Sequence, residues 1–196
     1  MIHTILGFLT LFLAIVSYSL YFRGIFKGNT RPHGVTWFIW SALNALVFYQ
    51  QLTHDAGPGA WVTGAAAVAN FCVFLFSFKY GERTVTRFDQ ACLVLAGVSI
   101  TSLIYNMGSD LSVILASTTF IIGFGPTLYK SFRKPLEETA ATFGLNSIKF
   151  LIALFALSSF TITTAVYPTV LFIVNAFFAV FLFVRRSSSY CNEPKD

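Results

Sequence analysis

The sequence predicts an all-α membrane protein with seven transmembrane helices, and three observations lead to this prediction. First, 56% of its 196 residues are hydrophobic and 11% are charged, whereas a soluble domain carries about 25% charged residues. Second, the apolar residues lie in segments of roughly 20 residues, the length that a helix needs to cross about 30 Å of hydrocarbon. Third, the basic residues fall in every second connection between these segments, which is the pattern of the positive-inside rule.

Each of seven apolar segments is long enough to cross a bilayer as a helix. The segments cover residues 4–22, 35–52, 60–78, 88–107, 111–129, 143–160 and 164–184. Most connections contain Gly or Pro together with charged residues, which are typical of turns. The weakest break is 158–168, where Ser and Thr supply most of the polarity. We expect a turn there because the apolar stretch is too long for one crossing.

The distribution of Lys and Arg predicts the orientation. All of them except Lys149 lie in the first, third or fifth connection or in the tail after residue 184. Because cytoplasmic connections favour positive charge, we expect an N-terminus outside the cell membrane and a C-terminus in the cytoplasm. Topology also accounts for the net charge of +5, so the basic residues give no reason to expect a nucleic-acid partner.

An internal repeat is consistent with this topology. Two triple-helix units can both start on the same side only if one helix between them reverses the chain. The expected parts are a first repeat, a linker helix, a second repeat and a cytoplasmic tail: 1–87, 88–110, 111–186 and 187–196. Asn70 in the third segment corresponds to Asn175 in the seventh, and Tyr21 at the end of the first corresponds to Tyr129 at the end of the fifth.

One stretch carries a family resemblance: Gly125-Pro-Thr-Leu-Tyr-Lys-Ser-Phe-Arg-Lys-Pro-Leu-Glu-Glu-Thr139. It resembles the helix end, basic turn and next helix start of the PQ-loop superfamily, which includes the SWEET sugar facilitators and is related in fold to the PnuC vitamin transporters. The resemblance implies two parallel three-helix repeats joined by a linker helix, an arrangement of three plus one plus three. It also implies that Asn70 and Asn175 face a central substrate cavity and that Pro126 is a candidate hinge.

Polar side chains within the segments are candidate site residues, because such groups are costly in lipid and by default mark a pathway or a site. Asn70 and Asn175 need hydrogen-bond partners that lipid does not offer, and they either bind substrate or clamp two helices together. Lys149 has two interpretations. Its long stem extends to the headgroups, or its ammonium points inward and binds an anionic group such as a carboxylate or a phosphate.

The second segment places Trp37, Trp40, Asn44 and Gln51 on one helical face. An aromatic ring beside an amide is suited to sugars and nucleosides, so Trp40 and Asn44 are candidate substrate-binding residues. Trp37 lies near the predicted boundary, where Trp is enriched as an interfacial anchor, and we expect that role for it. The same explanation competes with substrate binding at Trp40.

His33 precedes the second segment, where it either acts as a pH-sensitive gate or belongs to a turn whose direction Pro32 sets. The three histidines and three cysteines are scattered, so they predict no metal site, no cofactor and no disulfide framework. No catalytic set converges, and we expect the protein not to be an enzyme.

The predicted function is facilitated transport of a small polar metabolite, such as a sugar or a nucleoside, by alternating access. The alternative is a receptor or sorting protein of the PQ-loop type that binds a ligand without moving it. The expected partners are the small polar substrate and membrane lipid. Small residues around Gly64 allow close helix packing within one chain or between chains. The sequence is therefore compatible with both a monomer and a homo-oligomer.

Overall fold

The computed structural model describes residues 1–82, 86–105 and 108–191, which form helices joined by short turns. The α-helices are α1 Ile2–Phe26, α2 Gly34–Thr53, α3 Trp61–Tyr80, α4 Arg87–Ile104, α5 Ser109–Gly123, α6 Gly125–Arg133, α7 Ala140–Ala156 and α8 Ile162–Cys191. Short 3₁₀ turns, Gly57–Ala60 and Pro135–Glu137, lie before α3 and α7. The all-α prediction is confirmed for the described part of the chain.

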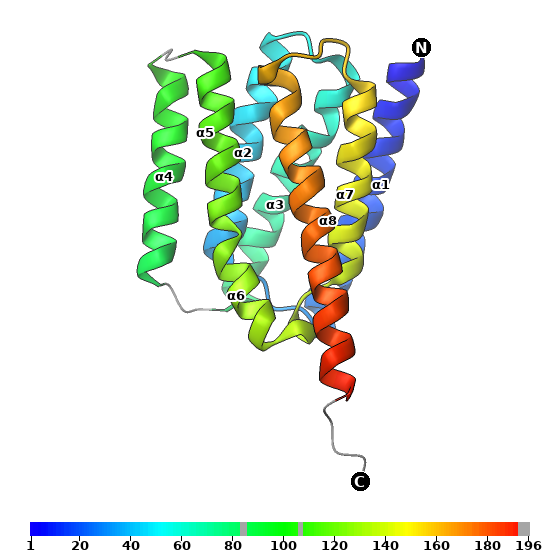
Figure 1. Ribbon diagram of the computed structural model, residues 1–196, viewed down its shortest axis with the longest axis vertical. Coiled ribbons are helices and arrows are strands. Elements are labelled where there is room, and N and C mark those ends of the chain that lie inside the picture. The colour runs from blue at the N-terminus through cyan, green and yellow to red at the C-terminus, as the bar shows by residue number, and fades with distance from the viewer. Residues whose placement is uncertain (83–85, 106–107, 192–196) are drawn as a thin grey trace.

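The predicted fifth segment, 111–129, is interrupted at Phe124. α5 and α6 follow each other directly, and α6 bends away from the axis of α5 (Figure 1). Pro126 in the first turn of α6 has no N–H, and its ring would clash with a carbonyl one turn earlier in a straight helix. The Phe124 N–H instead bonds the Ile121 carbonyl at 3.1 Å, a tighter 3₁₀-type contact. α5 and α6 therefore form one bent helical stretch rather than one straight helix.

The weakest predicted break is a real turn. α7 ends at Ala156 because Leu157 adopts an extended backbone, with ψ of 132°. The next N–H, that of Ser158, donates to the Ala56 carbonyl at 2.9 Å. This bond joins the connection after α7 to the connection after α2. At the other end of the chain α8 continues to Cys191, so the predicted tail begins as helix.

Four helical stretches are long and apolar enough to cross a membrane by length and composition. They are Ile2–Phe26, Gly57–Tyr80, Ser109–Arg133 and Ile162–Ser187, and Ala140–Ala156 is a shorter apolar helix. α2 is outside this set because it carries two glutamines and Asn44 among its apolar residues. These polar side chains are buried, so α2 forms the interior of the bundle.

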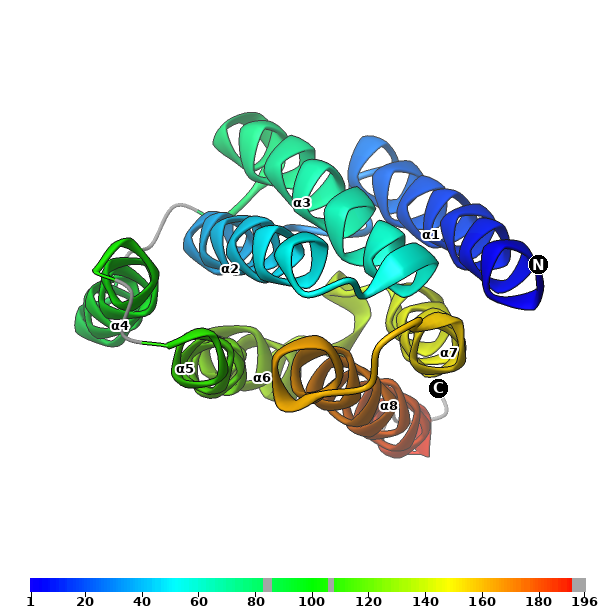
Figure 2. The ribbon, with the colours of Figure 1, turned by 90° about the horizontal axis from the view of Figure 1, so that it is seen from above.

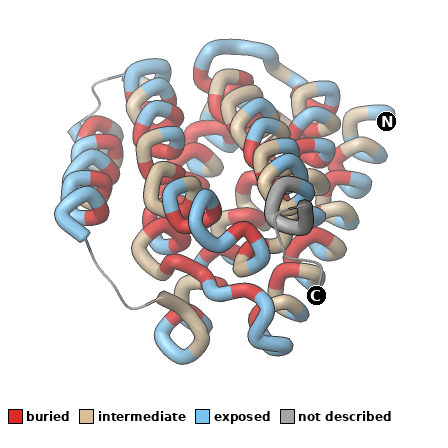
Figure 3. The backbone as a smooth tube through the Cα atoms, turned by 60° about the horizontal axis from the view of Figure 1, so that its bottom comes forward, coloured by how far each residue is buried: buried red, intermediate tan, exposed pale blue. Residues whose placement is uncertain are grey.

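The outer surface is apolar. Large hydrophobic side chains are exposed along several helices, among them Phe12 at 62%, Val68 at 67%, Phe155 at 68% and Phe183 at 72%. Figure 3 shows exposed positions on the outward sides of the helices and buried positions toward the centre. Water would not solvate so much apolar surface favourably, whereas hydrocarbon would, as expected for an integral membrane protein.

The helices pack in two groups. α3 packs against both α1 and α2, and α8 packs against both α5 and α7. Between the groups, α1 packs against α7 and α2 packs against α5. α4 lies at the edge of the bundle, where it contacts α2 and α5 (Figure 2).

The two ends of the bundle differ in charge. The N-terminus lies at one end and the C-terminus at the other (Figure 1). We call the lower end in Figure 1, where α1, α3, α6 and α8 finish, the basic end. The connections at the opposite end, 54–60, 105–108 and 157–161, contain no Lys or Arg. Arg83 and Lys195, which contributed to the charge prediction, lie outside the described residues.

Candidate binding site

A small cavity lies in the middle of the bundle, between the two helix groups. Its volume is about 20 Å³, enough for roughly one water molecule. Its lining comes from α1, α2, α3, α5, α7 and α8 and consists of Tyr18, Trp37, Trp40, Asn44, Ala66, Asn70, Phe120, Phe143, Asn146, Phe150, Leu171 and Asn175. Four amides and several aromatic rings therefore meet at one point inside an otherwise apolar molecule.

Asn70 and Asn175 are both buried at this cavity. The Tyr18 hydroxyl donates to Asn70 Oδ1 at 2.7 Å, so Asn70 joins α3 to α1. Asn175 Nδ2 donates to the Leu171 carbonyl of its own helix at 2.7 Å. Neither amide points toward lipid. Their role in substrate binding stays a prediction, and the Tyr18 bond makes Asn70 a clamp as well.

Trp40 and Asn44 carry unpartnered atoms at the cavity. Asn44 Nδ2 donates to the Trp40 carbonyl at 2.7 Å, which leaves Asn44 Oδ1 as a free acceptor. Asn44 Oδ1 and the Trp40 Nε1 donor are both buried without a hydrogen-bond partner in the described structure. An unsatisfied buried polar group costs about 1–3 kcal/mol. A ligand that offers both a donor and an acceptor would satisfy the pair.

Trp37 corrects one expectation. It is 2% exposed, and its ring lies 4.7 Å from that of Tyr21 and 5.2 Å from that of Trp40. A side chain enclosed by protein cannot anchor in the headgroup region, so the anchor interpretation of Trp37 is wrong. Gln51, on the same helical face, lies away from the cavity and donates to the Thr164 carbonyl at 2.9 Å.

Lys149 on α7 points into the protein. It is 0% exposed, so the interpretation that it extends to the headgroups is wrong. Its Nζ lies 4.3 Å from the Tyr18 ring centroid and 5.2 Å from that of Phe150, and it has no hydrogen-bond partner in the part that the structure describes. Burying an ammonium costs several kcal/mol, while a desolvated cation–π contact offsets only about 2 kcal/mol.

Among the lining residues that the sequence analysis missed are two with hydrogen-bonded polar groups, Asn146 and Tyr18. Asn146 on α7 accepts from the Ser17 hydroxyl at 2.8 Å, and it faces the cavity. The rule that selected Asn70, a strongly polar side chain within an apolar segment, applies equally to Asn146. Tyr18 gave no comparable signal, because a tyrosine in a transmembrane segment is also suited to packing and to the interface.

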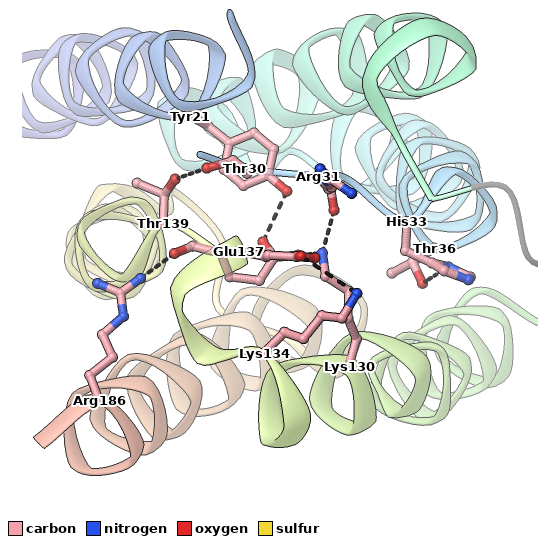
Figure 4. Close-up of polar contacts among 11 residues, drawn as sticks. Tyr21, Thr30, Arg31, His33, Thr36, Lys130, Lys134, Glu137, Thr139 and Arg186 are labelled. Atoms are coloured by element: carbon pink, nitrogen blue, oxygen red, sulfur yellow. Dashed lines mark hydrogen bonds and ion pairs between the residues drawn. The ribbon is translucent and has the colours of Figure 1, made fainter. Parts of the chain in front are cut away.

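A polar network closes the basic end (Figure 4). Lys130 Nζ lies 2.7 Å from Glu138 Oε1 in a buried ion pair, and it also donates to the Arg31 carbonyl. The Tyr21 hydroxyl donates to Glu138 Oε2 at 3.0 Å, and the Arg186 guanidinium donates to the Glu138 carbonyl. We call these five residues the basic-end latch.

The latch joins the two helix groups. Tyr21 and Arg31 belong to α1 and the connection after it, whereas Lys130 and Glu138 flank the turn between α6 and α7. Sequence reasoning missed the latch. Charge counting treats Lys130 as one more topological base, and nothing local shows that Glu138 is 2% exposed.

Hydrogen bonds also join helices at the opposite end of the bundle. The Thr163 hydroxyl donates to Asp110 Oδ1 at 2.5 Å, which joins the start of α8 to the start of α5. The Gln51 bond to Thr164 adds a contact between α2 and α8. Hydrogen-bonded contacts thus lie at both ends of the bundle, on either side of the central cavity.

His33 and Pro126 both line a larger hollow of about 590 Å³ at the basic end, together with Phe88 and Tyr129. His33 precedes α2; its Nδ1 lies 3.0 Å from Thr36 Oγ1, and its Nε2 lies 3.6 Å from Asp89 Oδ2. This contact links the start of α2 to the start of α4. Pro126 occupies the bend between α5 and α6, and its role as a hinge stays a prediction.

Among the described residues, no group of three or more His, Cys, Asp or Glu side chains is placed to hold a metal ion. Cys72 and Cys92 are free. No protein-family model, curated protein or solved structure matches this chain. The resemblance of residues 125–139 to the PQ-loop superfamily therefore stays a prediction.

Proposed function

We propose that this protein is a membrane transporter that facilitates the movement of one small polar metabolite by alternating access. The observation that carries the proposal is the central cavity, where buried amides meet between two helix groups. Transporters built from repeats hold their substrate near the bilayer midplane at the interface of those repeats.

The helix contacts support a seven-span arrangement of three plus one plus three. If α5 with α6, α7 and α8 correspond to α1, α2 and α3, then α8 takes the same place in its group as α3 does. Because α1 then matches α5 and α7 matches α2, the repeat relates the contact of α1 with α7 to the contact of α5 with α2. α4 is the linker helix. Asn70 and Asn175 become equivalent positions under this relation.

The proposed cycle starts from the arrangement in which both ends of the bundle are bonded. Parting of the basic-end latch would open the cavity to one side, and parting of Gln51 on α2 from Thr164 on α8 would open it to the other. The positive-inside rule assigns the basic end to the cytoplasm, so the N-terminus is outside. Rocking of the repeats about the bend at Pro126 would alternate the two openings.

Flux into proteoliposomes tests the proposal. We expect saturable uptake of at least one small polar solute from a panel of sugars, nucleosides and carboxylates, with D-glucose and uridine as the first probes. Specific binding without flux would instead support the receptor alternative. The absence of both binding and flux over the whole panel would contradict the proposal.

Asn70→Ala and Asn175→Ala test the site. Losing one hydrogen bond to the solute weakens binding by roughly 3–10-fold, and we expect a fall of that size in uptake at low solute concentration. Asn29→Ala, an exposed asparagine in the connection after α1, is the matched control and should transport normally. Full activity in both cavity variants would show that the site is elsewhere.

A further inference from the structure

We propose that the solute carries one negative charge and that Lys149 binds it. This inference rests on the proposed transport function and specifies its substrate class. The observation behind it is the charge of the bundle interior: Lys149 is fully buried, and no acidic group of the described chain lies against its ammonium.

The helices around Lys149 contain no carboxylate. α7 packs mainly against α8 and α1, and it also contacts α3. None of these four helices contains Asp or Glu. The buried acidic groups are engaged elsewhere: Glu138 with Lys130 in the latch, and Asp89 with Thr86 at the start of α4. A ligand is therefore the group that can supply the missing negative charge.

Tyr18 connects Lys149 to the cavity. One face of its ring carries the Lys149 ammonium, and its hydroxyl is bonded to Asn70 on the cavity wall. Asn146 and Phe150, on either side of Lys149 in α7, line the cavity directly. A solute that hydrogen-bonds the Asn70 amide would replace the Tyr18 hydroxyl there. Rotation of the freed Tyr18 ring would then expose the Lys149 ammonium to the solute.

The surroundings favour a hydroxylated monocarboxylate. Lys149 is the only Lys or Arg in the middle of the described bundle, and a single ammonium matches one carboxylate. A phosphate dianion needs further charge-assisted donors, and a zwitterionic solute needs an acidic partner for its ammonium. The Trp40 indole N–H and the Asn44 amide oxygen, both unpartnered, suit a hydroxyl group, which donates and accepts.

The test compares solutes that share a carbon skeleton, D-gluconate with D-glucose and L-lactate with L-lactamide. Proteoliposomes should take up the carboxylate of a pair at least about tenfold better than its neutral counterpart, because a hydrogen bond to a charged group is the stronger one. Uptake should also respond to an imposed membrane potential, since each uniported monoanion moves one charge.

Lys149→Met keeps the apolar stem and removes the charge, and it should abolish the carboxylate preference. Lys149→Arg should retain part of that preference. Lys27→Met, at an exposed lysine of the basic end, is the control and should behave as wild type. If Lys149→Met does not fold, Lys149→Gln serves in its place.

The outcomes separate the two proposals. Transport of the neutral solutes with rejection of the carboxylates would overturn the role of Lys149 and leave the transporter intact. A carboxylate preference that persists in Lys149→Met would also overturn it. Thermal stabilisation by D-gluconate that needs Lys149, without any flux, would support the anion site and contradict the transporter.

Discussion

Some of the buried polar atoms without a hydrogen-bond partner in the described structure lie around the centre of the bundle. Trp40 Nε1, Asn44 Oδ1, Lys149 Nζ and the Tyr167 hydroxyl are all buried without a hydrogen-bond partner within the described ranges. Buried polar groups are normally satisfied, and each exception calls for an explanation. The proposed solute would satisfy the atoms at the cavity wall.

The latch gives a prediction at the scale of single residues. Removing one partner of a buried ion pair costs about 3–5 kcal/mol, because the other charge stays buried and unpaired. We expect Lys130→Met to lower the midpoint of thermal unfolding in detergent by about 10 °C. The double variant with Glu138→Gln should lose less than the sum of the two single changes.

The control for this prediction is the neighbouring pair of Lys134 and Glu137, 3.5 Å apart, in which the lysine side chain is 56% exposed. An exposed pair contributes about 0–1 kcal/mol, so Lys134→Met should leave the midpoint nearly unchanged. Equal shifts of the midpoint in the Lys130 and Lys134 variants would show that the buried ion pair contributes no more to stability than the exposed pair.

At the scale of elements, the interior helix α2 buries polar as well as aromatic side chains. α2 buries Trp37, Trp40, Asn44 and Gln51 on one face, and three of these four line the cavity. Periodicity predicted that shared face correctly. It did not predict that protein would surround α2, and this is the reason that Trp37 was assigned to the headgroup region.

A close approach between elements yields a second stability prediction. A Cβ on Gly59 would lie 2.8 Å from the Ala153 carbonyl oxygen and 2.8 Å from the Leu157 nitrogen, both backbone atoms that cannot move independently. Gly59→Ala should therefore separate the turn before α3 from the end of α7 and lower the unfolding midpoint.

Gly97→Ala is the matched change within α4, where an added Cβ meets nothing within 4 Å. Alanine is favoured over glycine in a helix by about 1 kcal/mol, so this variant should be as stable as wild type or slightly more stable. Size-exclusion chromatography after heating measures both variants. Tolerance of alanine at Gly59 would contradict the close packing.

For the whole molecule, the charge asymmetry predicts which end faces the cytoplasm. We expect a cysteine at Asp55, on the end without Lys and Arg, to react with a membrane-impermeant maleimide in intact cells. A cysteine at Lys27, on the basic end, should react only after the membrane is permeabilised. Both positions are exposed. The background replaces Cys72, Cys92 and Cys191, and the reverse labelling pattern would refute the orientation.

The sequence by itself determined the helical segments, the apolar exterior and the choice of Asn70, Asn175, Trp40 and Asn44 as residues that could meet. These follow from the composition and periodicity of each segment, which depend on the chain locally. Even the bend at Pro126 has a local cause, the missing N–H of proline.

Only the tertiary structure decided the partners. It turned Lys149 inward onto Tyr18, brought Asn146 to the cavity and paired Lys130 with Glu138 beneath Tyr21. The physical reason is that a side chain's neighbours depend on the rotation and packing of several helices at once. Charge counted along the chain cannot tell a base in the headgroups from a base enclosed by protein.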